Sequence, residues 1–239
     1  MQESGILWNA TVLSQYISEE NFLALPTIRT VGFPDVKVIG GDELIDLLSQ
    51  SYDEVGMDET MVICRSNKRA NIYNNGIRNR ILFREEELEP GDMLMVAKNN
   101  YFWTEQSKET DFIANGDIAV VRRFRREREL YGFRFADVLL RFPDYNDLEL
   151  EVKLLLDTLH TDTPALPKEM GDRLYQSVME DYADITIKRE RMKKLKADPQ
   201  YNALQVKYAY AVTCHKAQGG QWKRVFLDQG YMTEEMLSP

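Results

Sequence analysis

Strand-like and helix-like segments alternate at both ends of the chain, and this alternation limits the folds open to it. Near the N-terminal end, the apolar run 60–66 leads into a helical pattern that Ser66 or Asn67 would open. Near the C-terminal end, the apolar run 204–213 reads as one strand and leads through a polar turn into a helix and another strand. Strands that alternate with helices form a parallel sheet covered on both faces. The two ends therefore predict one α/β domain, to which a short strand at 35–41 is also assigned.

The middle of the chain has a different pattern. Residues 91–160 contain short strand-like runs separated by Gly, Asn, Asp and Pro, which is typical of a small antiparallel β-barrel. Residues 161–200 read as a helical connection. We therefore expect an α/β domain made of residues 1–90 and 201–239, interrupted by the barrel and the helices.

Composition excludes several classes of protein. No apolar run approaches the roughly 20 residues of a membrane span, and the first residues lack the pattern of a secretion signal. The two cysteines lie far apart, which favours a reducing cytoplasm over a disulfide framework. The net charge is −9, but basic residues cluster in local runs, and local patches govern binding to a polyanion. We expect a cytoplasmic protein without a membrane partner.

The stretch "TCHKAQGGQW" (213–222) could hold a reactive pair, a metal or a phosphate. Adjacent residues at a strand end point to opposite faces, so Cys214 and His215 are badly placed to form a catalytic pair. A zinc site needs about four ligands, and His160 and Cys64 lie at unrelated positions. We assign no catalytic residue and no metal ligand. A phosphate-binding turn and an ordinary strand–loop–helix joint both remain open for this stretch.

Residues 208–222, "YAYAVTCHKAQGGQW", resemble the motif that ends the second motor domain of superfamily-one helicases. The most similar pattern is that of the RecD-like type, to which the exodeoxyribonuclease V alpha subunit belongs; it reads roughly T-x-H-K-S-Q-G-S-E-F. Ala217, Gln221 and Trp222 depart from it. The matching residues are Thr213, His215, Lys216, Gln218 and Gly219.

Two further segments resemble the same family in the same order along the chain. "VICRSNKRANIYN" (62–74) is similar to its strand-then-helix element, with matches at Arg65, Ser66 and Asn67 and with Ala70 in place of Ser. Residues 90–121 resemble the small barrel of the Src-homology type that RecD-like helicases insert in this domain. A "GD" strand start, a Lys-Asn pair and an "NGD" turn recur there.

The resemblance implies a RecA-like (P-loop NTPase-type) second motor domain of a DNA helicase. Single-stranded DNA and an upstream ATPase domain, on the same or another chain, would be its partners, and ATP and Mg²⁺ its cofactors in the full-length protein. The residues implied to bind DNA are Thr213, His215, Lys216, Arg65, Asn67, Lys98, Asn99, Asn100, Tyr101 and Asn115. Those implied to couple DNA to the nucleotide are Gln218, Gly219, Gly220 and Gln221.

A helicase motor needs a P-loop, G-x-x-x-x-G-K-[ST], and no glycine of this sequence begins one. The two arginine-bearing motifs of the family also fall outside the sequence, which suggests an excised second motor domain. We expect the isolated chain to hydrolyse no ATP. DNA-stimulated phosphate release by the purified chain would refute this expectation.

Two other functions remain open. Asp144, Glu151 and Lys153 fit the letters of a metal-dependent PD-(D/E)xK nuclease, in which two carboxylates hold a metal and a lysine assists the attacking water. A solvent-exposed β-hairpin accounts for the same residues. Alternatively, the barrel and the helices of 166–197 would form a non-catalytic module that binds nucleic acid or protein.

Overall fold

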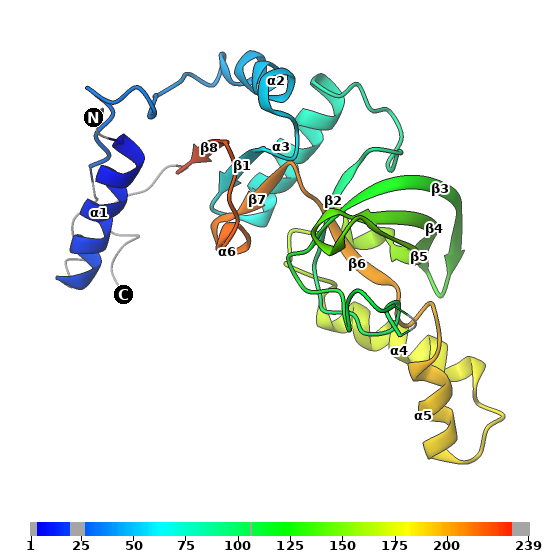
Figure 1. Ribbon diagram of the computed structural model, residues 1–239. Helices are drawn as coiled ribbons and strands as arrows, with labels where there is room; N and C mark the ends of the chain where they lie inside the picture. The colour runs from blue at the N-terminus through cyan, green and yellow to red at the C-terminus, as the bar shows by residue number, and fades with distance from the viewer. Residues whose placement is uncertain (1–3, 20–26, 106, 231–239) are drawn as a thin grey trace.

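The computed structural model describes residues 4–19, 27–105 and 107–230. Figure 1 shows a parallel sheet with its helices beside a closed barrel, and a helical hairpin that extends from the barrel. The sheet has the strand order β7-β1-β8, with all pairs parallel. The three strands are β1 (Thr60–Cys64), β7 (Ala211–Thr213) and β8 (Arg224–Asp228). The predicted α/β part with a parallel sheet is confirmed.

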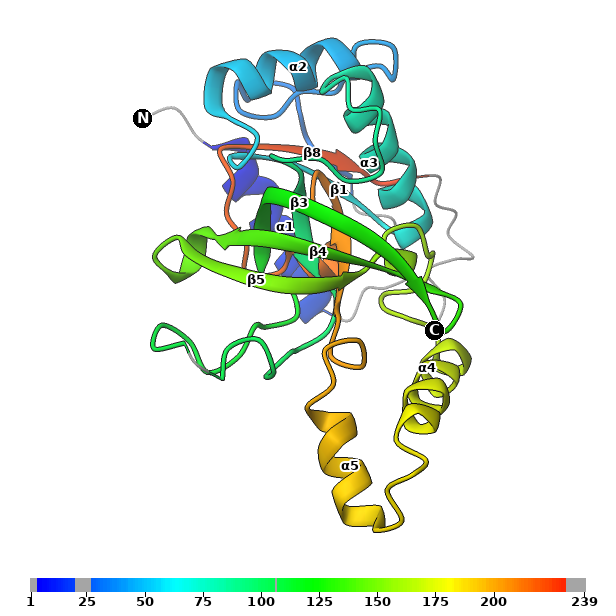
Figure 2. The same ribbon diagram turned by 90° about the vertical axis from the view of Figure 1, so that its right-hand side faces the viewer.

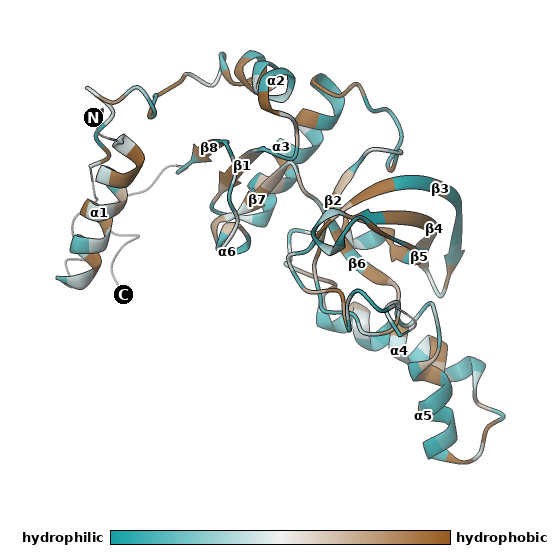
Figure 3. Ribbon diagram, viewed as in Figure 1, coloured by the Kyte–Doolittle hydropathy of each residue, from teal (hydrophilic) through white to brown (hydrophobic). Residues whose placement is uncertain are grey.

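Two helices pack on one face of this sheet (Figure 2). They are α2 (Leu44–Val55) and α3 (Asn67–Arg80). Ser66 begins α3, because its hydroxyl accepts a hydrogen bond from the Arg69 N–H at 3.3 Å. On the other face, Val225 and Leu227 of β8 are 48% and 55% exposed. Helices were expected to cover both faces of the parallel sheet, but this second face is left partly uncovered at β8. The apolar positions of β8 are visible in Figure 3.

The predicted strand at 35–41 is wrong. These residues have no strand partner, and Asp35 instead binds the start of α1 (Gly5–Ser18). Its carboxylate accepts hydrogen bonds from the Gly5 N–H at 2.9 Å and the Ser4 hydroxyl at 2.7 Å. A short apolar run cannot form a strand without a neighbour to pair with, and here the local capping of α1 fixes the segment instead.

The barrel closes in the order β2-β3-β4-β5-β6. Its first four strands are β2 (Met93–Val96), β3 (Ile118–Leu130), β4 (Phe133–Phe142) and β5 (Leu148–Leu155). Short 3₁₀ turns follow β4, at η1 (Pro143–Tyr145), and β5, at η2 (Leu156–Thr158). The fifth strand, β6 (Leu204–Tyr208), pairs parallel to β5 and antiparallel to β2. The predicted barrel is confirmed, but its last strand comes from beyond residue 201.

The run 204–213 is two strands and not the single strand expected. The chain leaves β6 at Tyr208 and enters β7 at Ala211, so it crosses from the barrel to the parallel sheet within two residues. The Asn74 side chain holds this crossing, because its Oδ1 accepts from Tyr210 N at 3.0 Å and Ala211 N at 2.8 Å. The sequence pattern could not reveal the break, because residues 208–213 are buried without interruption from the end of β6 through β7.

Between β5 and β6 lie α4 (Lys168–Asp181) and α5 (Lys188–Lys196), the two helices expected there. Leu174, Val178 and Leu195 pack with Phe133 and Phe135 in a second small core under the barrel. The outer surface of α5 is hydrophilic (Figure 3). No helix in the described part of the chain has the length and apolar character needed to cross a bilayer.

A buried ion pair joins the sheet to the barrel. Arg78 of α3 donates to both oxygens of Asp92, just before β2, at 2.9 and 3.0 Å, and the two side chains are 5% and 0% exposed. The Tyr210 hydroxyl donates to the same carboxylate at 2.9 Å. The Arg78 guanidinium also lies over the ring of Tyr208, 4.5 Å from its centroid. Side chains from α3, the segment before β2, and the end of β6 thus meet at one charged centre.

Asp92→Ala should lower the free energy of unfolding by about 3–5 kcal/mol, because it leaves the Arg78 charge buried without a partner. Urea denaturation of the purified chain measures this change. Glu85→Ala, at an exposed position in the same linker, is the control and should change stability by less than about 0.5 kcal/mol. Equal stability of the two variants would contradict the central role of this ion pair.

Candidate nucleic-acid interface

The carboxyl ends of β1 and β7 meet at one edge of the parallel sheet. Cys64, the last residue of β1, is in register with Thr213, the last residue of β7. Arg65 and Asn67 therefore follow one strand while His215 and Lys216 follow its neighbour. Ligands of parallel α/β sheets bind at this edge. The structure thus brings together the two segments that the sequence analysis selected, and Arg65 and His215 are both exposed there.

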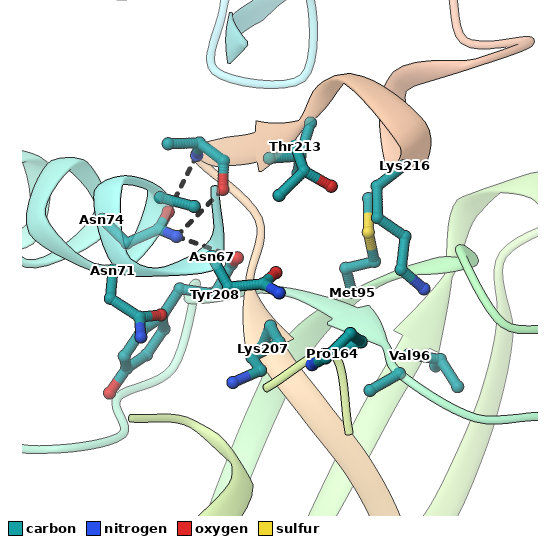
Figure 4. A pocket seen from close by; sticks show the side chains of 14 residues that line it. Asn67, Asn71, Asn74, Met95, Val96, Pro164, Lys207, Tyr208, Thr213 and Lys216 are labelled. Carbon is teal, nitrogen blue, oxygen red and sulfur yellow. Dashed lines mark hydrogen bonds between the residues drawn. The ribbon is translucent and has the colours of Figure 1, made fainter. Parts of the chain in front are cut away.

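Thr213 lies at the bottom of a small pocket between the sheet and the barrel. The residue is 8% exposed, and Figure 4 shows its hydroxyl turned toward the pocket. This hydroxyl does not cap the short helix α6 (Cys214–Ala217), and no other residue that lines the pocket forms a hydrogen bond with it. The pocket has a volume of about 30 Å³, roughly that of one water molecule. A larger ligand would extend beyond this volume, and the residues that line the pocket include Asn67, Asn71, Pro164, Lys207 and Lys216.

Lys216 connects this edge to the barrel. Its ammonium group donates to Oδ1 of Asn115, in the turn before β3. The Asn115 N–H in turn donates to Asn99 Oδ1 at 2.7 Å. Partial burial lowers the pKa of Lys216. Lys216 of the sheet domain and Asn115 and Asn99 of the barrel were each predicted to bind DNA. In the structure, hydrogen bonds connect the three residues.

Asn100 has a different role in the structure from its neighbour Asn99. Its amide donates to Asn202 O at 2.9 Å, and its Oδ1 accepts from the N–H groups of Phe102 and Trp103. The Trp103 indole donates to the same Asn202 carbonyl at 2.8 Å. The side chain of Asn100 thus holds the loop after β2 together, and its predicted contact with DNA would require these bonds to break.

Tyr101 presents an aromatic surface beside Lys98 and Asn99, which are also exposed. The residue is 62% exposed, and its ring stacks on Phe112, with centroids 5.2 Å apart and planes 26° from parallel. The sequence analysis missed Phe112. The bridge between Asn100 and Ile113 brings the two rings together, and a sequence pattern does not reveal such a pairing across a long loop.

The "QGGQW" stretch forms a turn that folds Trp222 back onto the core. Gly219 adopts φ +84°, a left-handed conformation that glycine accepts without strain. A Cβ on Gly220 would lie 2.1 Å from the Trp222 ring, so the two residues are in direct contact. Gln218 and Gln221 are exposed. These contacts explain both glycines structurally, and the coupling role of the four residues stays a prediction.

Asp228 is a further residue at this edge that the sequence analysis missed. It ends β8 in register with Cys64. Its carboxylate accepts from Arg69 Nε at 2.6 Å and from the Tyr73 hydroxyl at 2.7 Å. Burial alone would raise its pKa, but the hydrogen bonds from Tyr73, the Gly230 N–H and Arg69 outweigh burial and lower it. The carboxylate is therefore ionised at neutral pH and paired with Arg69.

Residues 208–238 match the family model of the UvrD-like helicase C-terminal domain. The match begins at the end of β6 and includes β7, the polar turn and β8. It supports a superfamily-one helicase C-terminal domain with a helicase-related, DNA-binding role, and the parallel sheet fits a RecA-like fold. A comparison of the chain with curated proteins found no match.

Gly220→Ala should displace the Trp222 ring and lower the free energy of unfolding by about 1–3 kcal/mol, because the new methyl group overlaps the ring. Urea denaturation would measure the loss. Gly219→Asn is the matched control, since no atom lies within 4 Å of a Cβ there and asparagine tolerates positive φ. A Gly220→Ala variant as stable as the control would contradict this packing.

Proposed function

We propose that this chain is the second motor domain of a RecD-like DNA helicase and that it grips single-stranded DNA where β1 and β7 end. The main support is the register between Cys64 and Thr213, which aligns the two helicase-like motifs at one edge of the sheet. The family match over residues 208–238 supports the helicase part of the proposal.

The geometry fits contacts with a nucleic-acid backbone. Arg65, His215 and Lys216 supply donors and charge next to Thr213, and Asn67 begins α3 beside them. Backbone contacts of this kind position a strand without reading its sequence. The stacked pair of Tyr101 and Phe112 offers a surface for one base, and stacking contributes about 1–3 kcal/mol per base in single-strand sites. The strand would then run from the sheet edge onto the barrel.

ATP and Mg²⁺ would bind on an upstream ATPase domain, on the same or another chain. Gln218, Gly219, Gly220 and Gln221 would pass the nucleotide state to the DNA-binding turn, since they follow it directly. The contact between Lys216 and Asn115 would carry the same movement into the barrel. In this proposal, the chain supplies one of the two DNA-binding surfaces, and the upstream domain supplies the residues that hydrolyse ATP.

The nuclease alternative has less support. Lys153 contacts Asp137, while Glu151 contacts Arg125, so the lysine and the carboxylate belong to separate ion pairs. Asp144 is exposed in η1. Among the described residues, no group of three or more His, Cys, Asp or Glu side chains is placed to hold a metal ion. An interaction module is favoured only by the exposed helical hairpin of α4 and α5.

Lys216→Ala should weaken binding of a fluorescein-labelled oligodeoxyadenylate and reduce the slope of log affinity against log salt by about 0.7, the value for one phosphate contact on a single strand. Fluorescence anisotropy over a series of salt concentrations measures both. Lys223→Ala is the control, because its ammonium pairs with Glu59, away from the pocket. The same slope in the two variants would remove Lys216 from the interface.

A further inference from the structure

We propose that Lys207 of the barrel and Thr213, Asn67 and Lys216 of the sheet domain together bind one phosphate group in the crease between the two modules. This inference rests on the proposed function, because the phosphate would belong to the bound single strand. What it adds is a ligand from the barrel wall, Lys207, that lies outside the helicase-like motifs. The phosphate would then be held by both modules at once.

Lys207 lies on β6, one residue before the crossing into the parallel sheet. Its ammonium donates to the carbonyl and to the hydroxyl of Thr161, the latter at 2.7 Å. An ammonium has three donors, so one remains for a ligand at the pocket. Within the described residues, no carboxylate lies within 4.0 Å of this ammonium, unlike those of Lys153 and Lys223. A half-buried cation therefore lines the pocket without an ion-pair partner.

The sheet side of the pocket supplies the hydroxyl of Thr213. Thr213 is more than nine-tenths buried and makes no hydrogen bond with the residues that line the pocket (Figure 4). The hydroxyl therefore keeps its donor and its acceptor sites available for a ligand oxygen at the pocket. The Asn67 side chain lies between Thr213 and Lys207 in the same view. Lys207, Asn67 and Thr213 line the same small pocket, and their donor groups suit one phosphate oxygen.

Charge in the crease favours an anion. Burial lowers the pKa of Lys207 to about 8, although the charge of Asp162 acts in the opposite direction. Lys216 on the sheet side is also a half-buried cation. Nearby charged and titratable groups include Tyr208, whose pKa burial raises and over whose ring the Arg78 guanidinium lies. The His160 ring lies 6.0 Å from that of Tyr208, and its Nε2 lies 2.9 Å from Glu87 Oε1. A phosphate would compensate the charge of the two partly desolvated ammonium groups.

A pH dependence follows from this arrangement. Lys207 has a lowered pKa, so it is charged at about pH 7 and loses its charge as the pH rises through about 8. Binding of a strand that uses this ammonium should weaken over the same range. An arginine at this position stays charged throughout, because a guanidinium keeps its proton at a much higher pH.

The test is the affinity of the full chain for a labelled oligodeoxyadenylate at about pH 7 and about pH 9, at constant low ionic strength. We expect the wild-type affinity to fall roughly 3- to 10-fold between these pH values, in line with the loss of one phosphate contact. Lys207→Arg should remove most of this fall. Lys207→Gln should bind about as weakly at the lower pH as the wild type does at the higher pH. Lys223→Gln, with circular dichroism as a check of folding, is the control.

Acetylation of lysines, located by mass spectrometry, gives a second readout that does not depend on DNA affinity. Lys207 should react faster than Lys223 near pH 8, and the oligonucleotide and inorganic pyrophosphate should both protect it. Tight oligonucleotide binding that Lys207→Gln and pH leave unchanged would overturn the crease site but leave the proposed function in place. Protection by pyrophosphate with no oligonucleotide binding would support the site and overturn the proposed function. An absence of both binding and protection would overturn both.

Discussion

The buried ion pair between Arg78 and Asp92 sets the relation between the two modules. Arg78 belongs to the helix that follows β1, and Asp92 to the segment that begins the barrel. Tyr210 binds the same carboxylate from the crossing between β6 and β7. A buried charge tolerates few alternative arrangements, because each polar atom requires its partner. The position of the barrel, and therefore of its loops beside the sheet edge, depends on this centre.

Local signals predicted much of the fold. Ser66 was a visible helix cap, and the apolar runs of β1 and β8 had the composition of strands. The incorrect expectations share a physical cause, which is that a strand is defined by its neighbour. Residues 35–41 had the right composition but no partner, and 204–213 had two partners in different sheets. A single sequence does not contain the pairing that decides such cases.

In the candidate site too, local sequence signals selected some residues, while others are brought there only by the three-dimensional structure. Resemblance to a helicase motif selected Thr213, His215 and Lys216, and the strand register places them beside Arg65. Asn99 and Asn115 were selected separately, and their contact with Lys216 emerges only in three dimensions. Lys207, Phe112 and Asp228 were not selected, because an isolated lysine, phenylalanine or aspartate in a strand or loop has no distinctive pattern. Their proximity to the motifs is a product of the barrel closure and the sheet register.

The crossing between β6 and β7 has a mechanical consequence. Only Ala209 and Tyr210 separate a barrel strand from a sheet strand, and both are buried. A hinge needs residues that are free to change their dihedral angles. Tyr210 is held by Asn74 and Asp92, and the Ala209 N–H donates to the Met93 carbonyl at 2.9 Å. The crossing between β6 and β7 is therefore rigid. Five residues along the chain lead from Tyr208 to Thr213, so a displacement of the end of β6 would be transmitted directly to the turn that follows β7.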